Sequence, residues 1–220
     1  MSVWGVAIAA TATLAVAAAQ AADERAKTFT FGRGDLGKVP AGWKAEQTGK
    51  GEGSVWKVVE DATAPSKSGF ALAQMAESPG PMFNLCVVQD SNLADVELRV
   101  KFKSVEGVRD QGGGLVWRYQ DANNYYIARM NPLEDNYRLY HVVAGKRTQF
   151  GGKERIKVPV GEWHTLSVRT VGEKIECFLD GQKEIEGTDK TITKAGKVGL
   201  WTKSDARSRF DQFVVKDLGK

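Results

Sequence analysis

The sequence predicts an all-β fold, and three observations carry this prediction. Strand-length runs of apolar and β-branched residues recur at short intervals, and turn-forming residues stand between them. The clearest run, residues 96–102, places Val, Leu, Val and Phe at alternate positions with Glu, Arg and Lys between them. No segment beyond the first 22 residues keeps a helical 3.6-residue period over ten residues. This patterning is typical of sheets with one face buried and one face in water.

Ten further runs share this strand-like character. They are residues 55–59, 70–74, 85–88, 114–119, 125–130, 137–143, 164–170, 174–179, 197–202 and 210–215. The connections between them carry Asn, Asp and Gly, and the Asp-Gly pair at residues 180–181 predicts a two-residue hairpin. Short strands at this spacing over residues 28–217 predict one domain, a two-sheet sandwich or jelly roll.

The first 22 residues form a separate segment. They contain no charged side chain, and residues 6–19 are all Ala, Val, Leu, Ile or Thr. The small-x-small pattern Ala19-Gln20-Ala21 and a charged stretch follow, which predicts a secretory signal peptide over residues 1–22 and a periplasmic or extracellular protein. The usual Lys or Arg near the start is missing. The alternative is a retained membrane anchor, so membrane contact is expected only through this segment if it is not cleaved.

Composition excludes several classes of protein. The net charge is +4, from 31 Lys+Arg and 27 Asp+Glu, and the two signs are interspersed. A nucleic-acid-binding protein needs a basic stripe, so no nucleic-acid partner is expected. Two Cys and two His are too few for a four-cysteine zinc site or multi-histidine metal chemistry. Cys86 and Cys177 lie in apolar runs, and the sequence leaves open whether they pair in an oxidising compartment or stay as buried thiols.

Two glycine-rich stretches do not support a nucleotide site. Residues 32–37 fit G-x-G-x-x-G, but Pro40 follows where a phosphate-binding site needs a helix. Residues 112–114 are three glycines without the Gly-Lys-Ser/Thr of a P-loop. Because they open a predicted strand, they indicate close backbone approach or a bulge.

Familiar catalytic patterns are also missing. His141 and His164 share the strand parity of apolar neighbours, which favours inward-facing, hydrogen-bonded histidines over a catalytic triad. Glu134 and Asp135 are adjacent and follow a proline, so they are expected in a loop. The sequence therefore contains no local carboxylate pair of the kind that retaining glycosidases use.

Seven strings in order carry a resemblance to a known family. They are residues 37–43, 55–59, 113–119, 124–129, 162–166, 196–205 and 210–213. Together they resemble the secreted bacterial family called the 3-keto-disaccharide hydrolase domain, a branch of the concanavalin A-like lectin/glucanase superfamily. The resemblance runs from about Phe29 to Val215.

This resemblance implies a concanavalin A-like jelly-roll sandwich of two antiparallel sheets and a carbohydrate partner. The family's name implies hydrolysis of keto-sugar glycosides, an activity of some of its members. Members that resemble the enzymes carry Ser-Gly before an Arg-bearing strand and acidic residues in the next strand. In this sequence Gly113-Gly114 replaces the Ser-Gly, and residues 125–128, which contain no acidic residue, replace the acidic strand. Of these family features only the arginine is present, as Arg118. No catalytic residue is therefore assigned, and the sequence leaves open whether the chain is an enzyme.

Candidate binding residues follow from the chemistry of sugars, which pack C–H surfaces on aromatic rings and hydrogen-bond to polar side chains. Six candidates for a groove on a concave sheet are Arg118, Tyr126, Arg129, Tyr140, Trp201 and Lys203. The alternative is that the aromatic residues belong to the core. The superfamily resemblance also implies calcium, with Asp211 as a candidate ligand.

Three functions are weighed. The first is an exported carbohydrate-binding jelly roll with a sugar-binding groove. The second is a hydrolase that cleaves 3-keto-glycosides or related glycosides. The third is a laminin-G-like domain that binds a protein partner.

Overall fold

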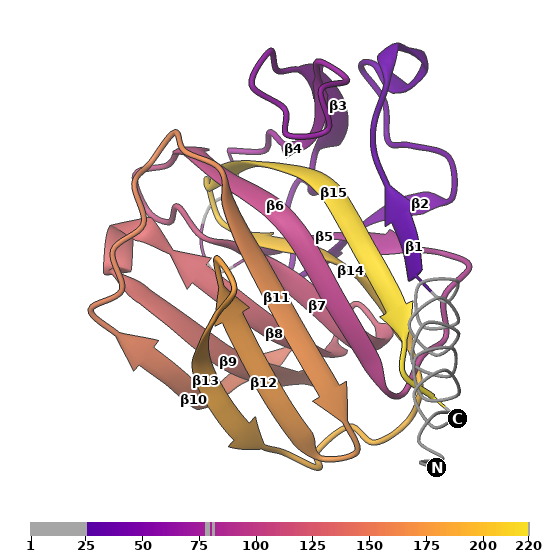
Figure 1. Cartoon of the computed structure of the whole chain (residues 1–220), viewed down its shortest axis with the longest axis vertical. Coiled ribbons are helices and arrows are strands. Elements are labelled where there is room, and N and C mark those ends of the chain that lie inside the picture. Colours follow the sequence, from indigo (N-terminus) through magenta and orange to yellow (C-terminus); the bar gives the residue numbers. More distant parts are fainter. Residues whose placement is uncertain (1–25, 78–79, 81, 220) are drawn as a thin grey trace, which may run out of the picture.

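The computed structural model describes residues 26–77, 80 and 82–219, and this part of the chain forms two antiparallel sheets packed face to face (Figure 1). The predicted signal segment, residues 1–22, lies outside the described residues. The described helices are two short 3-10 helices, η1 (Arg33–Asp35) and η2 (Pro132–Glu134). Within the described residues, neither is long and apolar enough to cross a membrane.

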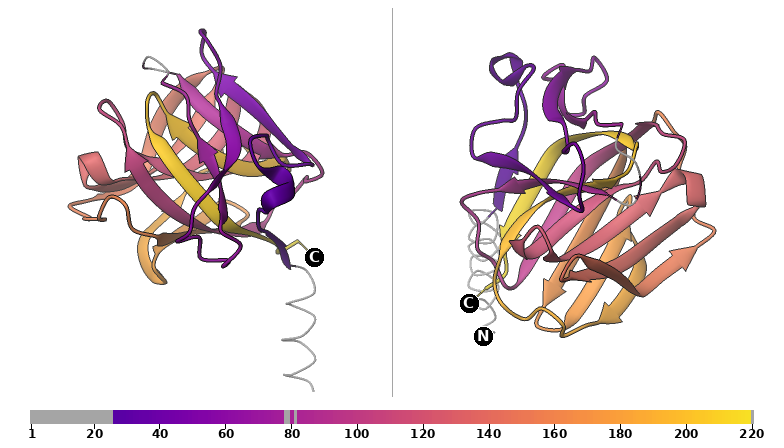
Figure 2. Two further views of the ribbon diagram at one scale, coloured as in Figure 1. Left: turned by 90° about the horizontal axis from the view of Figure 1, so that it is seen from above. Right: turned by 180° about the vertical axis from the view of Figure 1, so that it is seen from behind.

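The first sheet has eight strands in the order β13-β12-β11-β6-β15-β4-β3, and β1 pairs with β15 beside this path. Its strands are β1 (Ala26–Phe29), β3 (Trp56–Glu60), β4 (Phe70–Gln74), β6 (Val96–Glu106), β11 (His164–Val171), β12 (Lys174–Leu179), β13 (Gln182–Thr188) and β15 (Arg207–Asp217). The antiparallel pairing of β1 with β15 brings the two ends of the described domain together (Figure 2).

The second sheet has seven strands in the order β10-β9-β8-β7-β14-β5-β2. Its strands are β2 (Trp43–Thr48), β5 (Phe83–Val88), β7 (Gly113–Asp121), β8 (Asn124–Asn131), β9 (Asn136–Val143), β10 (Lys146–Glu154) and β14 (Lys197–Lys203). In Figure 1 this sheet lies behind the first one, and the right panel of Figure 2 turns it to the front.

All eleven runs predicted from the sequence coincide with strands, and the all-β fold of two antiparallel sheets is confirmed. Four further strands, β1, β2, β10 and β13, were not predicted. Three of these, β2, β10 and β13, are edge strands, and none of the residues of β10 is fully buried. An edge strand needs no regular alternation of apolar residues, so the pattern that predicts a strand is absent there.

Alternate side chains of both sheets meet in one apolar layer between them. Leu98 and Val100 of β6 and Ala128 of β8 are fully buried in this layer. Cys86 and Cys177 also lie in it. Both are buried and unbridged, and burial raises the pKa of each thiol well above its usual value.

The second sheet is buried on its other side as well. We call this side, which faces away from the first sheet, the outer face. Its apolar cluster consists of Phe83, Leu85, Val87, Val116, Tyr119, Tyr125, Ile127, Tyr140, Val142 and Trp201. The side chains of the central strands β7, β8 and β14 are therefore buried on both sides of this sheet.

Arg118, predicted as a sugar-binding residue, holds loops together instead. It lies at an irregularity of β7 with a left-handed φ of 46°, and its side chain is buried. Its guanidinium donates hydrogen bonds to the carbonyl oxygens of Ala94, Ile192 and Gly172 at 2.9, 3.0 and 2.6 Å. The Asp95 carboxylate lies 3.6 Å from its Nη2. With all three nitrogens engaged, Arg118 connects three loops at one end of the sandwich.

We therefore expect Arg118→Met to lower the free energy of unfolding by about 3–5 kcal/mol, because it leaves buried carbonyl groups without a donor. Urea unfolding followed by tryptophan fluorescence measures the change. Arg155→Met is the matched control, since Arg155 is exposed, and its effect should stay within about 0.5 kcal/mol. An equal effect of the two substitutions would contradict the structural role of Arg118.

Candidate functional site

A cation lies over three aromatic rings on the outer face. The Arg147 guanidinium of β10 is 4.3 Å from the ring centre of Tyr140, 5.1 Å from that of Phe83 and 5.7 Å from that of Trp201. We call these four residues the arginine–aromatic cluster. Cation–π attraction strengthens when water is excluded, and burial lowers the pKa of Arg147. Its Nη1 is buried and has no hydrogen-bond partner among the described residues.

An ionic network borders this cluster. Arg129 of β8 and Asp110, both almost fully buried, approach to 3.6 Å between Nη1 and Oδ2. The Lys203 Nζ of β14 lies 3.4 Å from the same carboxylate oxygen. Arg129 also lies over Tyr140, with 5.8 Å between its Cζ and the ring centre. Tyr140 therefore connects the arginine–aromatic cluster to the ionic network.

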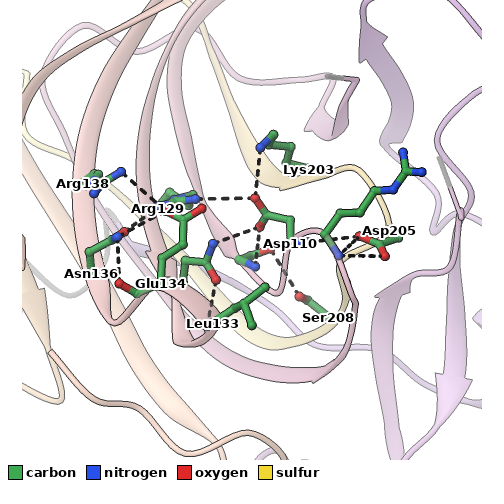
Figure 3. A network of polar contacts seen from close by, with 12 residues as sticks. Asp110, Arg129, Leu133, Glu134, Asn136, Arg138, Lys203, Asp205 and Ser208 are labelled. Carbon is green, nitrogen blue, oxygen red and sulfur yellow. Dashed lines mark hydrogen bonds and ion pairs between the residues drawn. The ribbon is translucent and has the colours of Figure 1, made fainter. Parts of the chain in front are cut away.

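Glu134 and Asn136 complete the surroundings of Arg129. The Arg129 Nη2 donates to Glu134 Oε2 at 2.9 Å and to Asn136 Oδ1 at 2.6 Å. Arg138 lies 3.4 Å from the same Glu134 oxygen (Figure 3). The hydrogen bond from Arg129 is the main cause that lowers the pKa of Glu134 to about 2. Glu134 therefore stays ionised across the physiological range, and it is a weak base.

The loop between β6 and β7 holds Asp110 in place. The Asp205 carboxylate accepts hydrogen bonds from the backbone N–H groups of Val108, Arg109 and Asp110. Asp110 Oδ1 in turn accepts the Gly112 N–H at 2.7 Å (Figure 3). Although burial alone raises the pKa of Asp205, the hydrogen bonds from the backbone lower it below its usual value. The position of the Asp110 carboxylate thus depends on a loop whose backbone is held by Asp205.

The three glycines at the start of β7, Gly112 just before the strand and Gly113 and Gly114 in it, are explained by close packing. A Cβ at Gly113 would lie 2.3 Å from the Phe102 ring, and one at Gly114 would lie 2.2 Å from the Ala128 carbonyl oxygen. A Cβ at Gly112 would lie 2.9 Å from the Asp110 carboxylate. The predicted close backbone approach is confirmed at this place.

The structure brings four of the six candidate sugar-binding residues together. Arg129, Tyr140, Trp201 and Lys203 belong to the arginine–aromatic cluster or to the ionic network. Tyr140 and Trp201 are only 4% and 0% exposed, and Arg147 lies over both of their rings. An open aromatic platform is therefore not present in this arrangement.

Arg118 and Tyr126 lie elsewhere. Arg118 engages backbone carbonyls, as described above. Tyr126 faces the core between the sheets, where its ring stacks on Trp117 with 5.2 Å between ring centres. Its hydroxyl donates to Asp189 Oδ1 at 2.6 Å. Strand alternation explains this, since Tyr125, not Tyr126, shares the outer face with Arg129.

The surroundings of Asp211 do not fit calcium. Its carboxylate is buried and accepts the backbone N–H groups of Ser66 and Gln212, both at 2.8 Å. Calcium takes six to eight oxygen ligands. Within residues 26–77, 80 and 82–219 no group of three or more metal-ligating side chains is present. The implied calcium is therefore not supported by this donor set.

Both histidines lie beside carboxylates. His141 Nδ1 is 3.3 Å from Asp189 Oδ2, and His164 Nδ1 is 2.7 Å from Asp180 Oδ2. Each is partly buried, in agreement with the prediction of hydrogen-bonded histidines. Neither belongs to the arginine–aromatic cluster or to the ionic network.

The comparisons with known proteins agree with this fold. Residues 35–216 match the family described as the 3-keto-alpha-glucoside-1,2-lyase-like domain, so the chain belongs to that family. No curated protein sequence matches the chain. The carbohydrate-binding module CBM66 from Bacillus subtilis is similar in structure, with a TM-score of 0.63 and 16% identity over 80% of this chain and 96% of the module.

Two further solved structures share the sandwich. The cellulose induced protein Cip1 has a TM-score of 0.58 and 10% identity, over 81% of this chain and 93% of that protein. The exoplasmic/lumenal domain of VIP36 in its Ca²⁺-bound form has a TM-score of 0.59 and 11% identity, over 90% and 93%. At these identities the likeness shows a jelly-roll fold of the lectin and carbohydrate-binding-module kind.

Sequence reasoning missed Asp110, Glu134 and Arg147 as members of the site. Arg147 lies on an edge strand that the pattern did not predict, and Asp110 lies in a loop. The three glycines after Asp110 were a usable signal, because such close packing fixes the loop beside it. Nothing in the sequence indicated that Glu134 would meet Arg129.

The depressed pKa of Glu134 predicts a pH-dependent contribution to stability. The carboxyl group has a usual pKa near 4.5 and a folded value of about 2, so its contribution is present above pH 4.5 and disappears as the pH falls toward 2. We expect Glu134→Gln to lower the free energy of unfolding by about 1 kcal/mol at pH 7, given its partial exposure. The difference from wild type should shrink toward pH 2.

Urea unfolding from pH 7 to pH 2 measures this difference. Glu52→Gln is the control, because Glu52 is exposed, and it should change the free energy of unfolding at pH 7 by no more than about 0.5 kcal/mol. A Glu134→Gln difference that grows on acidification would contradict the assignment.

Proposed function

We propose that the protein is an exported carbohydrate-binding protein whose sugar site is the outer face around Arg147. The observation that carries this proposal is the arginine–aromatic cluster beside the ionic network. It places aromatic surface and hydrogen-bond donors next to each other, which is the combination that sugars need. Membership of a family named for a keto-glucoside, and the structural likeness to a protein titled a carbohydrate-binding module, support the same class of ligand.

Access to the rings depends on Arg147. Its guanidinium covers the aromatic faces, and Arg has a long side chain with several rotatable bonds. A sugar ring that takes its place would pack against Tyr140 and Trp201. The displaced guanidinium, whose Nη1 has no partner in the described part of the chain, would donate to sugar oxygens. The arrangement thus supports binding in which Arg147 moves and stays in contact with the ligand.

The charges at the site favour ligands rich in acceptors. Arg147, Arg138 and Lys203 can only donate hydrogen bonds, and the last two are 27% and 23% exposed in their side chains. A 3-keto sugar carries a carbonyl, which only accepts, where an ordinary sugar carries a hydroxyl. A keto sugar is therefore the best-matched ligand of this donor set.

Cleavage of keto-glycosides is the second candidate, and the family description favours it. Removal of a proton beside a carbonyl needs a base with a pKa near the working pH. Glu134 has a pKa of about 2 and is paired with Arg129. Asp110 is fully buried, so a substrate does not reach its carboxylate. Neither carboxylate fits that role, so we place binding ahead of catalysis. A laminin-G-like protein interaction remains the third reading.

We expect Arg147→Ala to weaken binding of a 3-keto-glucoside at least about tenfold, because it removes a charged hydrogen-bond donor from the site. Isothermal titration calorimetry with the 3-keto-glucoside and with the parent glucoside measures the effect and the preference for the ketone. Lys146→Ala, one residue away and exposed, is the matched control and should bind as wild type does.

Two results would contradict the proposal. One is no heat of binding with any sugar of a broad glycan panel. The other is equal affinity of Arg147→Ala and wild type. Turnover of the 3-keto-glucoside, measured as the release of product, would instead support the enzymatic candidate. Capture of a protein by the folded domain, without sugar binding, would support the third candidate, a protein-interaction domain.

A further inference from the structure

A groove crosses the opposite side of the molecule, on the face of the first sheet that points away from the core. Two hollows of about 410 and 420 Å³ lie there. Both are lined by Arg99 of β6 and Thr165 of β11, so they are neighbours, and we call the two together the groove. The first hollow extends toward β15 and β1, and the second toward β12, where it reaches Phe178. Figure 1 looks onto this face, and these five strands follow one another across it.

Strand register explains the groove. One residue of each of five neighbouring strands forms a row across the sheet. In strand order β12, β11, β6, β15 and β1, the row consists of Phe178, Ser167, Arg99, Val214 and Thr28. The residues that flank Arg99 in this row, Ser167 and Val214, are short, so the surface is low on each side of the arginine. At the usual spacing of neighbouring strands the row is about 19 Å long. The groove is therefore long enough for a chain of sugars rather than for a single one.

The 410 Å³ hollow is basic and polar. Arg99 and Lys101 line it together with Thr28, Thr165 and Gln212, and no carboxylate is among its lining residues. Lys101 Nζ donates to Thr165 Oγ1 at 2.8 Å. Arg99 is exposed and has no ion-pair or hydrogen-bond partner among the residues that the structure describes. The guanidinium is thus free to bind an anion.

In the second hollow the charges are balanced. Glu97 and Arg169 lie opposite each other on β6 and β11, and the Asp180 carboxylate accepts the backbone N–H of Thr165 at 2.7 Å. Phe178 adds a half-buried aromatic surface at the far end. This half offers little net charge and resembles a sugar-binding surface, with an aromatic ring beside polar groups.

We propose that this groove binds an acidic polysaccharide, a chain of uronate sugars. Its carboxylates meet Arg99 and Lys101, its hydroxyls meet Thr28, Thr165 and Gln212, and a sugar ring packs on Phe178. Guanidinium groups bind carboxylates through two parallel hydrogen bonds, which gives this site its preference for acidic over neutral chains. The groove lies on the sheet opposite the arginine–aromatic cluster, so this inference does not depend on the function proposed for that cluster.

The test uses the folded domain and polygalacturonate, with neutral galactan for comparison. We expect wild type to be retarded in native gels that contain polygalacturonate and not in gels that contain galactan. Arg99→Gln and Ser167→Tyr should each weaken binding at least about tenfold, the first by removing the charge and the second by filling the groove. Added salt should weaken binding by wild type, because the contact between Arg99 and a sugar carboxylate would be exposed to solvent.

Controls separate this site from general charge and from the first site. Arg155→Gln removes one exposed charge elsewhere and should bind within about twofold of wild type, and Arg147→Ala should do the same. The inference is overturned if wild type ignores polygalacturonate or if Arg99→Gln and Ser167→Tyr bind as wild type does. It is also overturned if Arg155→Gln weakens binding to polygalacturonate as much as Arg99→Gln does. If wild type binds polyglutamate as strongly as polygalacturonate, the proposed sugar ligand is overturned in favour of an acidic peptide.

Discussion

Side chains along a β-strand point alternately to opposite faces, and in the second sheet both faces are buried. This constraint decides the role of each residue there. On β8, Tyr126, Ala128 and Met130 point into the layer between the sheets, while Ile127 and Arg129 point to the outer face. A slip of one residue would exchange these sets and carry the Arg129 charge into an apolar layer. The register of the central strands is therefore strongly specified.

A charge buried on such a face must be paired, and the pairing draws the loops into position. Arg129 is surrounded by Asp110, Glu134 and Asn136, which come from a loop, from η2 and from the start of β9. Removing one member of a buried pair costs more than the pair itself contributes. The ionic network thus limits how the β6–β7 loop can move, and it keeps the donors of the outer face at one edge of the arginine–aromatic cluster.

Two arginines show how the backbone decides the function of a side chain. Arg118 and Arg147 both lie at the second sheet. Arg118 has a left-handed backbone conformation, and the pairing of β7 with β8 is irregular there. Its side chain therefore turns toward backbone carbonyl groups, and each of its three nitrogens donates to one of them. Arg147 lies on an edge strand over aromatic rings and keeps an unused donor within the described part of the chain. The donors of the first are all used within the fold, and the second is the one to which we assign a ligand.

The two outer surfaces of the sandwich differ in the size of the side chains that they carry. The outer face of the second sheet is filled by large aromatic side chains, and Arg147 lies over three of their rings. The corresponding face of the first sheet carries short side chains beside Arg99 and is therefore grooved. One jelly roll can in this way present an aromatic surface covered by an arginine on one side and open hollows on the other.

The sequence by itself determined the all-β class, the eleven strands that carry strand-like apolar runs, the close approach at the three glycines and the family. These features are local, because period-two patterning and turn residues act between neighbours in the chain. Only the tertiary structure decided the edge strands, the turning of Arg118 away from the outer face, and the meeting of Asp110, Glu134 and Arg147 with Arg129 and Tyr140. Those residues lie on different strands and loops, and contacts of that kind depend on which strands become neighbours in the sheet.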